Sequence, residues 1–265
     1  MVKLRLRETI MVNMQDELDG KVALVTGSAR NIGRATVEEL ARAGASVVIN
    51  SLQAKDLCEE VADGINAAGG EAIVVMADVR DPQQVGAMAA AIIEAFGGID
   101  IVVHNAAVRS NQSFSEMDYE TFSHIIDLSI NGCFHLAKAT MSSMIERGGG
   151  SFIGVGGMTS LMGVKGRSHV MAAKMGLNAF IRGLALDLAE YNIRANQVVV
   201  GHYETVRERN PSSAPQRSAT DIKVPLGRKG LPQDMANLIR FLVGPGASYI
   251  TGQTVHSNGG AYLNL

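Results

Sequence analysis

VALVTGSARNIGRAT (residues 22–36) is the stretch that decides the fold of this chain. The apolar run VALVT leads into a turn that contains Gly27, Asn31 and Gly33, and a helical pattern follows the turn. A short apolar run that ends at a glycine is typical of a buried parallel strand. A turn of this kind lets the backbone approach a pyrophosphate, which the N–H groups and dipole of the helix N-terminus stabilise. The stretch therefore predicts a dinucleotide-binding turn.

The alternation of strand and helix patterns continues towards the C-terminus. Short apolar runs are separated by segments whose apolar residues recur at the helical period, and this spacing implies βαβ units. We therefore predict an α/β fold in which a parallel sheet carries helices on both faces. The predicted strands are residues 21–27, 45–50, 71–79, 99–107, 150–157, 193–201 and 252–260, and the predicted helices are residues 31–44, 56–70, 81–98, 119–149, 168–191 and 231–244.

Composition argues against several classes of protein. The formal net charge is −2, which gives no reason to expect nucleic acid or an acidic membrane as a partner. No apolar run reaches the ~18 residues that a membrane span needs. Cys58 and Cys133 are far apart in sequence and form neither a metal motif nor a disulfide framework, which favours a reducing cytoplasm. No cluster of His, Cys and Asp supports a metal site.

The alternation of strands and helices indicates one domain that follows a short N-terminal extension. Residues 1–20 lack the apolar core and the cleavage site of a signal peptide, so we interpret them as an N-terminal extension. Residues 21–265 show no sequence repeat and no second domain, and we predict a single dinucleotide-binding and catalytic domain. Residues 202–225 have no period and hold three of the six prolines, which is typical of a functional loop such as a lid.

Three motifs resemble the short-chain dehydrogenase/reductase family. TGSARNIG (residues 26–33) is similar to its TGxxxGxG signature, HNAA (104–107) to its NNAG, and residues 224–260 to its C-terminal stretch. The resemblance runs from about Lys21 to the C-terminus. It implies a doubly wound (Rossmann) parallel sheet of about seven strands, a nicotinamide dinucleotide, and a homotetramer or homodimer.

The residues at the predicted cofactor site favour NADP over NAD. An NAD-preferring site of this fold usually places an acid at the end of the second strand, but here that strand ends at Asn50 and Ser51. Arg30 lies in the phosphate turn, where basic residues of the family meet a 2′-phosphate. Asp78 and Val79 end the third strand, where an adenine would lie. The predicted cofactor-binding residues are Gly27, Ser28, Arg30, Asn31, Ile32, Gly33, Asn50, Ser51, Asp78, Val79, Asn105, Ala106, Lys174 and Thr205.

The resemblance carries over only part of the family's catalytic set. Its serine, tyrosine and asparagine positions fall on Gly157, Val170 and Ser129, while the lysine is present as Lys174. In the family this lysine binds the nicotinamide ribose and lowers the pKa of the tyrosine, which moves the proton. The residue before Val170, His169, lies roughly 140° around the helix from Lys174.

A branch of the family, the dienoyl-CoA reductases, also lacks this tyrosine. Its asparagine before a glycine is similar to Asn131-Gly132, and its own tyrosine position falls on Thr159. Hydride addition to a conjugated alkene needs a hydrogen-bond donor at the carbonyl oxygen rather than a strong acid. The predicted catalytic residues are therefore Lys174, Ser129, Asn131 and Thr159.

Three functional hypotheses follow. The first is an NAD(P)-dependent oxidoreductase with an altered proton relay, acting on an activated alkene, an acyl thioester or another small molecule. The second is a cofactor-binding protein without hydride transfer, acting as a sensor, a scaffold or an inactive partner. The third is a non-redox lyase or dehydratase on the same fold, which the retained phosphate turn disfavours.

Overall fold

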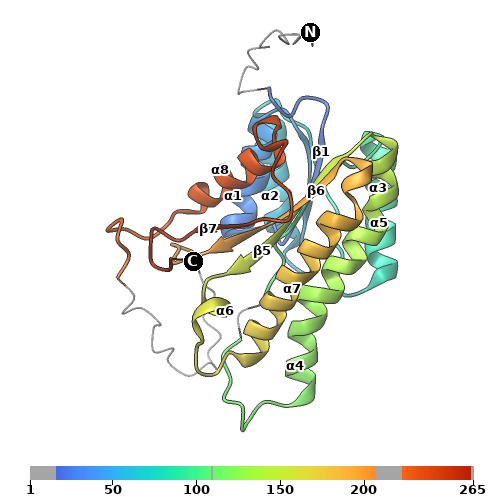
Figure 1. Cartoon of the computed structure of the whole chain (residues 1–265). Helices are drawn as coiled ribbons and strands as arrows, with labels where there is room; N and C mark the ends of the chain where they lie inside the picture. The colour runs from blue at the N-terminus through green and yellow to red at the C-terminus, as the bar shows by residue number, and fades with distance from the viewer. Residues whose placement is uncertain (1–15, 109, 207–222, 264–265) are drawn as a thin grey trace, which may run out of the picture.

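One sheet of seven parallel strands forms the centre of the protein, in the order β3-β2-β1-β4-β5-β6-β7. The computed structural model describes residues 16–108, 110–206 and 223–263. The strands are β1 (Val22–Thr26), β2 (Ser46–Asn50), β3 (Ala72–Val74), β4 (Ile101–His104), β5 (Gly150–Gly157), β6 (Ile193–Val200) and β7 (Thr254–Ser257). The predicted doubly wound parallel sheet is confirmed (Figure 1).

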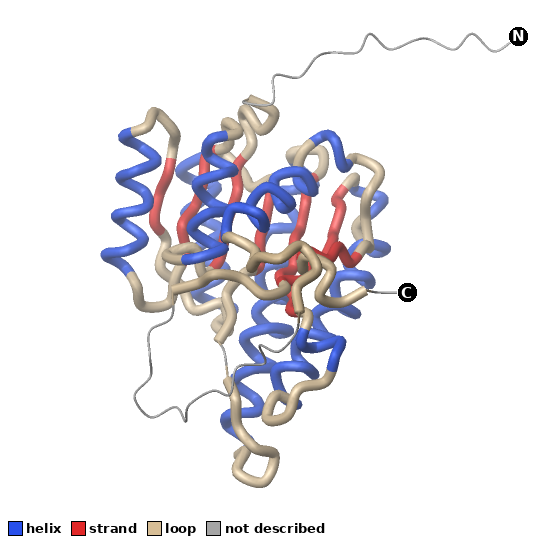
Figure 2. Tube along the Cα trace, turned by 90° about the vertical axis from the view of Figure 1, so that its left-hand side faces the viewer, coloured by secondary structure: helices blue, strands red, loops and turns tan. Residues whose placement is uncertain are grey.

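Helices cover both faces of this sheet (Figure 1). The helices are α1 (Asn31–Arg42), α2 (Lys55–Ala67), α3 (Pro82–Phe96), α4 (Tyr119–Ile126), α5 (Gly132–Glu146), α6 (Thr159–Met162), α7 (Ser168–Asp187) and α8 (Pro232–Val243). One buried apolar cluster lies between the sheet and α1, α2 and α8, and a second lies between the sheet and α3, α5 and α7. Figure 2 shows the row of strands with helices in front of it and behind it.

The order of the strands reverses at β1. The chain runs outward from β1 through β2 to β3, and then returns to place β4 on the other side of β1. In open parallel sheets of this kind, ligands bind beyond the carboxyl ends of the strands at such a switch point. The pairing of Thr26 with Asn50, and of Val25 with Val103, brings the ends of these three strands together.

Several elements differ from the sequence-based prediction. The strands predicted at 99–107 and 252–260 are shorter, at Ile101–His104 and Thr254–Ser257. The third strand covers only Ala72–Val74, because beyond it the side chain of Asn50 takes the backbone carbonyls that a longer strand would use. The long helix predicted at 119–149 is interrupted by a π-helical turn at Asp127–Asn131. The short helix α6 follows β5 directly and was not predicted, since four residues are too few for a helical period.

Parts of the predicted extension and lid lie outside the described residues. The described chain begins at residue 16, so residues 1–15 of the predicted extension are not among them. The predicted lid is described at residues 202–206 and 223–225, whereas residues 207–222 are not. Among the described residues, every helix is too short or too polar to cross a membrane. The single-domain assignment stays a prediction.

Asp100 joins the amino ends of β1 and β4 on the side of the sheet opposite the switch point. Its side chain is 2% exposed. It accepts hydrogen bonds from the backbone N–H of Val22 (2.9 Å), Arg147 Nε (2.8 Å) and Lys21 Nζ (3.2 Å). A buried carboxylate with three charge-assisted or backbone donors stabilises the fold more than a surface ion pair does.

We expect Asp100→Asn to lower the free energy of unfolding by about 2 kcal/mol, because the amide removes the charge and turns an N–H₂ group towards donors. Urea denaturation followed by circular dichroism measures the change. Asp63→Asn, the same replacement at an exposed position of α2, should stay within about 0.5 kcal/mol of the parent. Equal stability of the two variants would contradict this role for Asp100.

Candidate active site

The turn after β1 is shaped by residues with special backbone requirements. Gly27 and Asn31 have φ angles of 62° and 52°, in the left-handed region that glycine and asparagine tolerate. A Cβ on Gly33 would lie 2.2 Å from the carbonyl oxygen of Gly27, so only glycine fits there. Among the described residues no side chain caps α1, so its first N–H groups are available to an anion. The predicted phosphate turn therefore has the shape that a pyrophosphate needs.

The segment after β4 is hydrogen-bonded to this turn and holds it in place. Asn105 Nδ2 donates to the carbonyl oxygens of Thr26 (3.0 Å) and Gly27 (2.9 Å). The Thr26 hydroxyl accepts from the backbone N–H groups of Asn105 (3.1 Å) and Ala106 (3.0 Å). Asn105 and Ala106, both predicted at the cofactor site, thus lie against the turn and hold its backbone in place.

Two of the predicted cofactor residues have buried side chains that act as supports. The Ser28 hydroxyl accepts from the backbone N–H of Asn50 at 3.0 Å. The Asn50 amide donates to the carbonyl oxygens of Val75 (3.0 Å) and Ala77 (3.2 Å). These side chains tie the ends of β1, β2 and β3 to one another, so their contribution to a ligand site is to position the surrounding backbone.

The other residues near the switch point differ in exposure. Ile32, in the first turn of α1, has its side chain buried in the core, whereas Arg30, the residue before α1, is exposed. Ser51 is half-buried just past β2, where its hydroxyl accepts a long hydrogen bond of 3.4 Å from the backbone of Ala54. No carboxylate occupies positions 50 or 51, so nothing at this strand end would repel a ribose 2′-phosphate.

The chain between β3 and α3 carries an ion pair that sequence reasoning missed. Arg80 Nη2 lies 2.6 Å from Asp78 Oδ2, and this hydrogen-bonded guanidinium holds the pKa of Asp78 below its usual range. Arg80 Nη1 also lies 2.7 Å from Nδ1 of His124 on α4. The carbonyl oxygen of Val79 accepts from His135 Nδ1 at 3.1 Å. An arginine two residues after Asp78 was the available signal for this pair.

Lys174 lies on α7 with its side chain directed towards β5. Nζ donates to the carbonyl oxygen of Val155 at 2.7 Å. Burial lowers the pKa of Lys174 to about 8, although the thiol of Cys133 acts in the opposite direction. Burial, helped by the nearby Lys174 ammonium, lowers the pKa of His104 to about 3, so His104 is neutral at physiological pH.

The π-helical turn places Ser129 against the end of β4. Ser129 is buried, and its carbonyl oxygen accepts from Nε2 of His104 at 3.2 Å. Asn131 is exposed, and its amide donates to Asp127 at 2.7 Å within the same turn. The neutral His104 therefore has a structural role, linking β4 to the π turn, and Ser129 contributes through its backbone.

The position aligned with the tyrosine shares α7 with Lys174, and the position aligned with the serine ends β5, the strand to which Lys174 donates its hydrogen bond. Gly157 ends β5, two residues after Val155, and a Cβ built there meets no heavy atom within 4 Å. Val170 is half-buried on α7, one turn before Lys174. Thr159 begins α6 and is half-buried, and the Ser160 hydroxyl donates back to the carbonyl of Gly157 at 2.6 Å. Space for a side chain at position 157 thus exists.

The chain after β6 forms the wall of the candidate site that faces the phosphate turn. Among the residues that the structure describes, Thr205 Oγ1 is buried and has no hydrogen-bond partner. Thr205 lines an open groove of about 730 Å³ together with the phosphate turn and the start of α8. The groove-lining residues are Asn31, Arg34, Ala35, Glu38, Tyr203, Glu204, Thr205, Val206, Lys229 and Pro232. Buried hydroxyl groups in proteins normally form a hydrogen bond, and the carboxamide of a nicotinamide dinucleotide could form one with Thr205.

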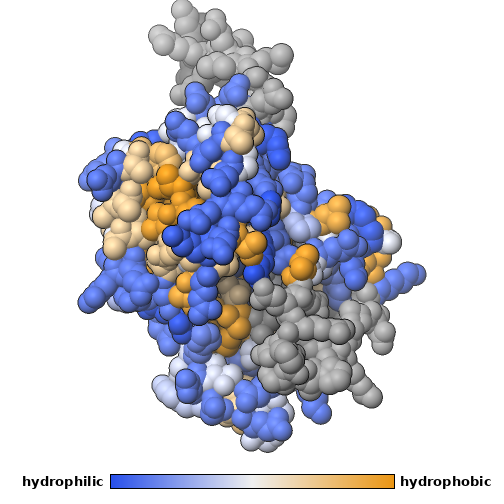
Figure 3. Space-filling view, turned by 180° about the vertical axis from the view of Figure 1, so that it is seen from behind, coloured by the Kyte–Doolittle hydropathy of each residue, from blue (hydrophilic) through white to orange (hydrophobic). Residues whose placement is uncertain are grey.

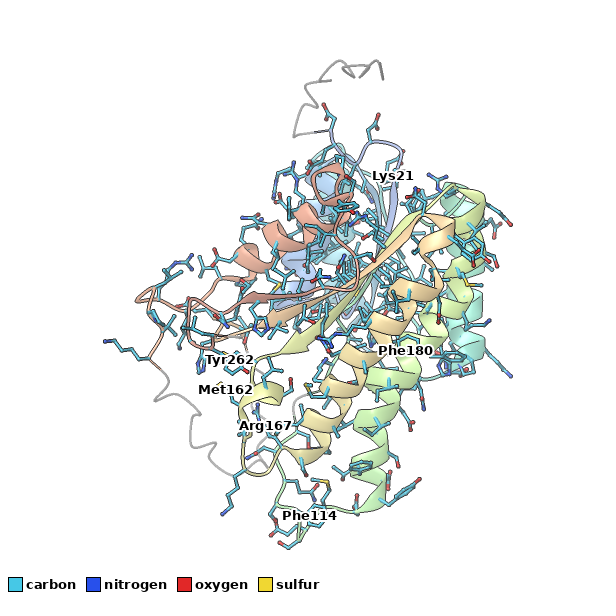
Figure 4. All side chains as sticks on the ribbon, in the orientation of Figure 1. Lys21, Phe114, Met162, Arg167, Phe180 and Tyr262 are labelled. Carbon is cyan, nitrogen blue, oxygen red and sulfur yellow. The ribbon has the colours of Figure 1, made fainter. Side chains whose placement is uncertain are left out.

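These features gather at one end of the molecule. Figure 4 shows Met162 of α6 and Tyr262 towards the carboxyl end of the sheet, whereas Lys21 lies at the opposite end. Among residues 16–108, 110–206 and 223–263, no group of three or more His, Cys, Asp or Glu could hold a metal ion.

Comparison with known proteins agrees with this architecture. Residues 27–262 match the family described as Enoyl-(Acyl carrier protein) reductase. The chain is 36% identical over 247 residues to the 3-oxoacyl-(acyl-carrier-protein) reductase of Vibrio cholerae, covering 93% of this chain and 99% of that protein. It is also 36% identical over 250 residues to the L-rhamnose 1-dehydrogenase (NAD(P)(+)) of Azotobacter vinelandii, covering 92% and 98%.

Solved structures with the same fold also come from dehydrogenases and reductases. A short-chain type dehydrogenase/reductase from Mycobacterium marinum superposes with a TM-score of 0.84 at 31% identity, covering 94% of this chain and 98% of that one. A dehydrogenase/reductase from Sinorhizobium meliloti superposes with a TM-score of 0.86 at 30% identity over the same shares. With its parallel sheet, its glycine turn at the switch point and these relatives, the chain belongs to the short-chain dehydrogenase/reductase family of oxidoreductases.

Proposed function

We propose that this protein is an NADP(H)-dependent oxidoreductase that acts on acyl-thioester or related small-molecule substrates through a proton relay without a tyrosine. The observation that carries the proposal is a combination of two features. The residues around the phosphate turn fit a dinucleotide, whereas the positions that align with the family's catalytic serine and tyrosine hold glycine and valine. The phosphate turn, the Asn105 support and the unpartnered Thr205 hydroxyl fit a dinucleotide. Gly157 and Val170 leave Lys174 as the basic group beside the reacting position.

The preference for NADP rests on charge. An exposed Arg30 at the start of α1 offers a guanidinium to a 2′-phosphate, to which arginine binds well. The absence of an acid at Asn50 and Ser51 removes the usual partner of the ribose 2′-hydroxyl in NAD-binding sites. One relative is named as using NAD(P)(+), which supports a nicotinamide dinucleotide without choosing between the two forms.

The substrate class is inferred from the names of relatives and from the substrate side of the site. The matched family and several relatives are named for acyl-carrier-protein thioesters, whereas another is named for a sugar. When bound, the dinucleotide would supply a hydride to a carbonyl carbon or to the β-carbon of a conjugated alkene. The chain must then offer a proton or a hydrogen bond at the substrate oxygen, and the small Gly157 and Val170 leave room for it.

Lys174 is the residue that we assign to this proton step. Its ammonium makes one described hydrogen bond, to Val155, and has three N–H donors, so it can also bind a ligand. A general acid works best when its pKa is close to the working pH, and the pKa of Lys174 is lowered to about 8. An unperturbed lysine, at about 10.4, would give up its proton far less readily.

A second candidate is a cofactor-binding protein without hydride transfer. It is favoured by Val170, which cannot supply the acid that a tyrosine would. The third hypothesis, a non-redox lyase or dehydratase, is disfavoured by the retained phosphate turn. The cytoplasmic location stays a prediction.

A homo-oligomer is also proposed. The rear face carries a group of hydrophobic residues along the side of α3 and α5 (Figure 3). Ile93 is an exposed apolar side chain on α3. An exposed patch of this kind is typical of an interface with another protein chain.

The function is tested with the purified chain, NADPH, and a panel of 3-oxoacyl and enoyl thioesters. We expect NADPH consumption equal to product formed, with a preference for NADPH over NADH of about tenfold, equivalent to one charge-assisted hydrogen bond. Arg30→Ala should abolish this preference, whereas Arg182→Ala, an exposed position on α7, should retain it. NADPH binding without turnover of any substrate would favour the second candidate.

The rate of reduction should depend on the protonated form of Lys174. With a pKa of about 8, this form predominates below pH 8 and is lost above it. We therefore expect kcat to be flat at low pH and to fall about tenfold per pH unit above the pKa. Lys174→Arg stays protonated throughout, so it should lower kcat and remove the fall. A wild-type rate that rises through pH 8, or an arginine variant with the same fall, would exclude Lys174 as the donor.

Restoring the family's hydroxyls should strengthen ketone reduction. Gly157→Ser fits, because a Cβ there meets nothing within 4 Å. Combined with Val170→Tyr, it should raise kcat/KM for a ketone substrate by about 10²-fold, the lower end of general acid catalysis. Gly157→Ser with Val170→Phe is the matched control, since it adds the ring without the acid. Equal rates for the two double variants would contradict the assignment of position 170.

A further inference from the structure

A pair of hydrogen bonds joins the phosphate turn to the chain after β6. Asn31 Nδ2 donates to the carbonyl oxygen of Val206 at 3.1 Å, and the backbone N–H of Val206 donates to Asn31 Oδ1 at 2.8 Å. The two residues are 175 positions apart in sequence. The side-chain amide thus pairs with the backbone of Val206 as a neighbouring strand would.

Asparagine is the residue that can do this at position 31. The backbone there has φ 52°, which glycine and asparagine adopt with little strain. Glycine, which the family signature has at this position, would keep the conformation but has no side chain to pair. An ionised aspartate could accept from the Val206 N–H but could not donate to its carbonyl, and serine has a single oxygen in place of the separate acceptor oxygen and donor nitrogen of an amide.

The pair lies where two walls of the candidate site face each other. Tyr203 is buried, and its hydroxyl lies 2.5 Å from Ser257 Oγ on β7. The N–H of Glu204 donates to the carbonyl of Gly230 at 2.8 Å. The chain is therefore anchored to β7 at Tyr203, to Gly230 before α8 at Glu204, and to the phosphate turn at Val206. Thr205, whose buried hydroxyl has no partner among the described residues, lies between these anchors.

We propose that Asn31 is a positioning residue whose amide braces the Thr205 wall against the phosphate turn and thereby slows release of the dinucleotide. The inference rests on the proposed function, because the dinucleotide would lie along both walls. Walls that are already in place lower the ordering cost of binding. A ligand held between them leaves only when the walls separate, which requires the two hydrogen bonds to break.

The test compares three full-length chains by two measurements. NADPH dissociation is followed by stopped-flow fluorescence, and exchange of the Val206 amide proton is followed by NMR without cofactor. Asn31→Gly keeps the backbone conformation and removes the brace. Asn66→Ala is the matched control, because the Asn66 amide makes the same two-bond pair with the backbone of Ala72, at 3.1 and 2.8 Å, on the far edge of the sheet.

We expect Asn31→Gly to raise the NADPH dissociation rate about five- to tenfold, the effect of one hydrogen bond, and to remove protection of the Val206 amide. Asn66→Ala should leave both unchanged. A Val206 amide that exchanges equally in wild type and Asn31→Gly would overturn the inference, as would loss of protection without faster dissociation. A wild-type chain that binds neither NADPH nor NADH would instead overturn the proposed function.

Discussion

The approach of α1 to β1 at the phosphate turn is the constraint on which the rest of the site depends. A single carbon atom added at Gly33 would lie 2.2 Å from the Gly27 carbonyl oxygen and 2.6 Å from the amide nitrogen of Asn105. The strand, the helix and the segment after β4 can therefore meet only around a bare backbone. Because these three segments meet, N–H groups of α1 stand at the reversal of the strand order, where a diphosphate can bind.

The opposite side of the site is organised by buried polar groups rather than by close backbone packing. A neutral His104 links β4 to the π turn, and Lys174 links α7 to β5. Both residues thus hold structural elements together whether or not a tyrosine is present. Lys174 therefore has a role beside Val170 that needs no tyrosine: it ties α7 to β5, and burial makes its proton easier to lose.

The sequence predicted the sheet, the phosphate turn and the position of Lys174, because each rests on a local pattern. It misjudged the extent of elements that tertiary contacts control. The third strand is short because the Asn50 amide takes its later carbonyls, and the long helix is interrupted where its π turn meets His104. The sequence could place Ser28 and Asn50 at the ends of strands. The groups that their side chains contact depend on the neighbouring strands, which the sequence pattern does not specify.

The amino-acid sequence by itself determined the order of strands and helices, the glycines of the turn and the residue types at the positions that align with the family's catalytic residues. These follow from periodicity, from backbone conformation and from spacing along one helix, all of which are local. Only the tertiary structure decided that Arg80 meets His124 on α4, that Asn31 reaches Val206, and that the Thr205 hydroxyl is buried with no hydrogen-bond partner among the described residues. Such pairings join residues brought together by the packing of separate segments, and no local pattern encodes which side chains will meet.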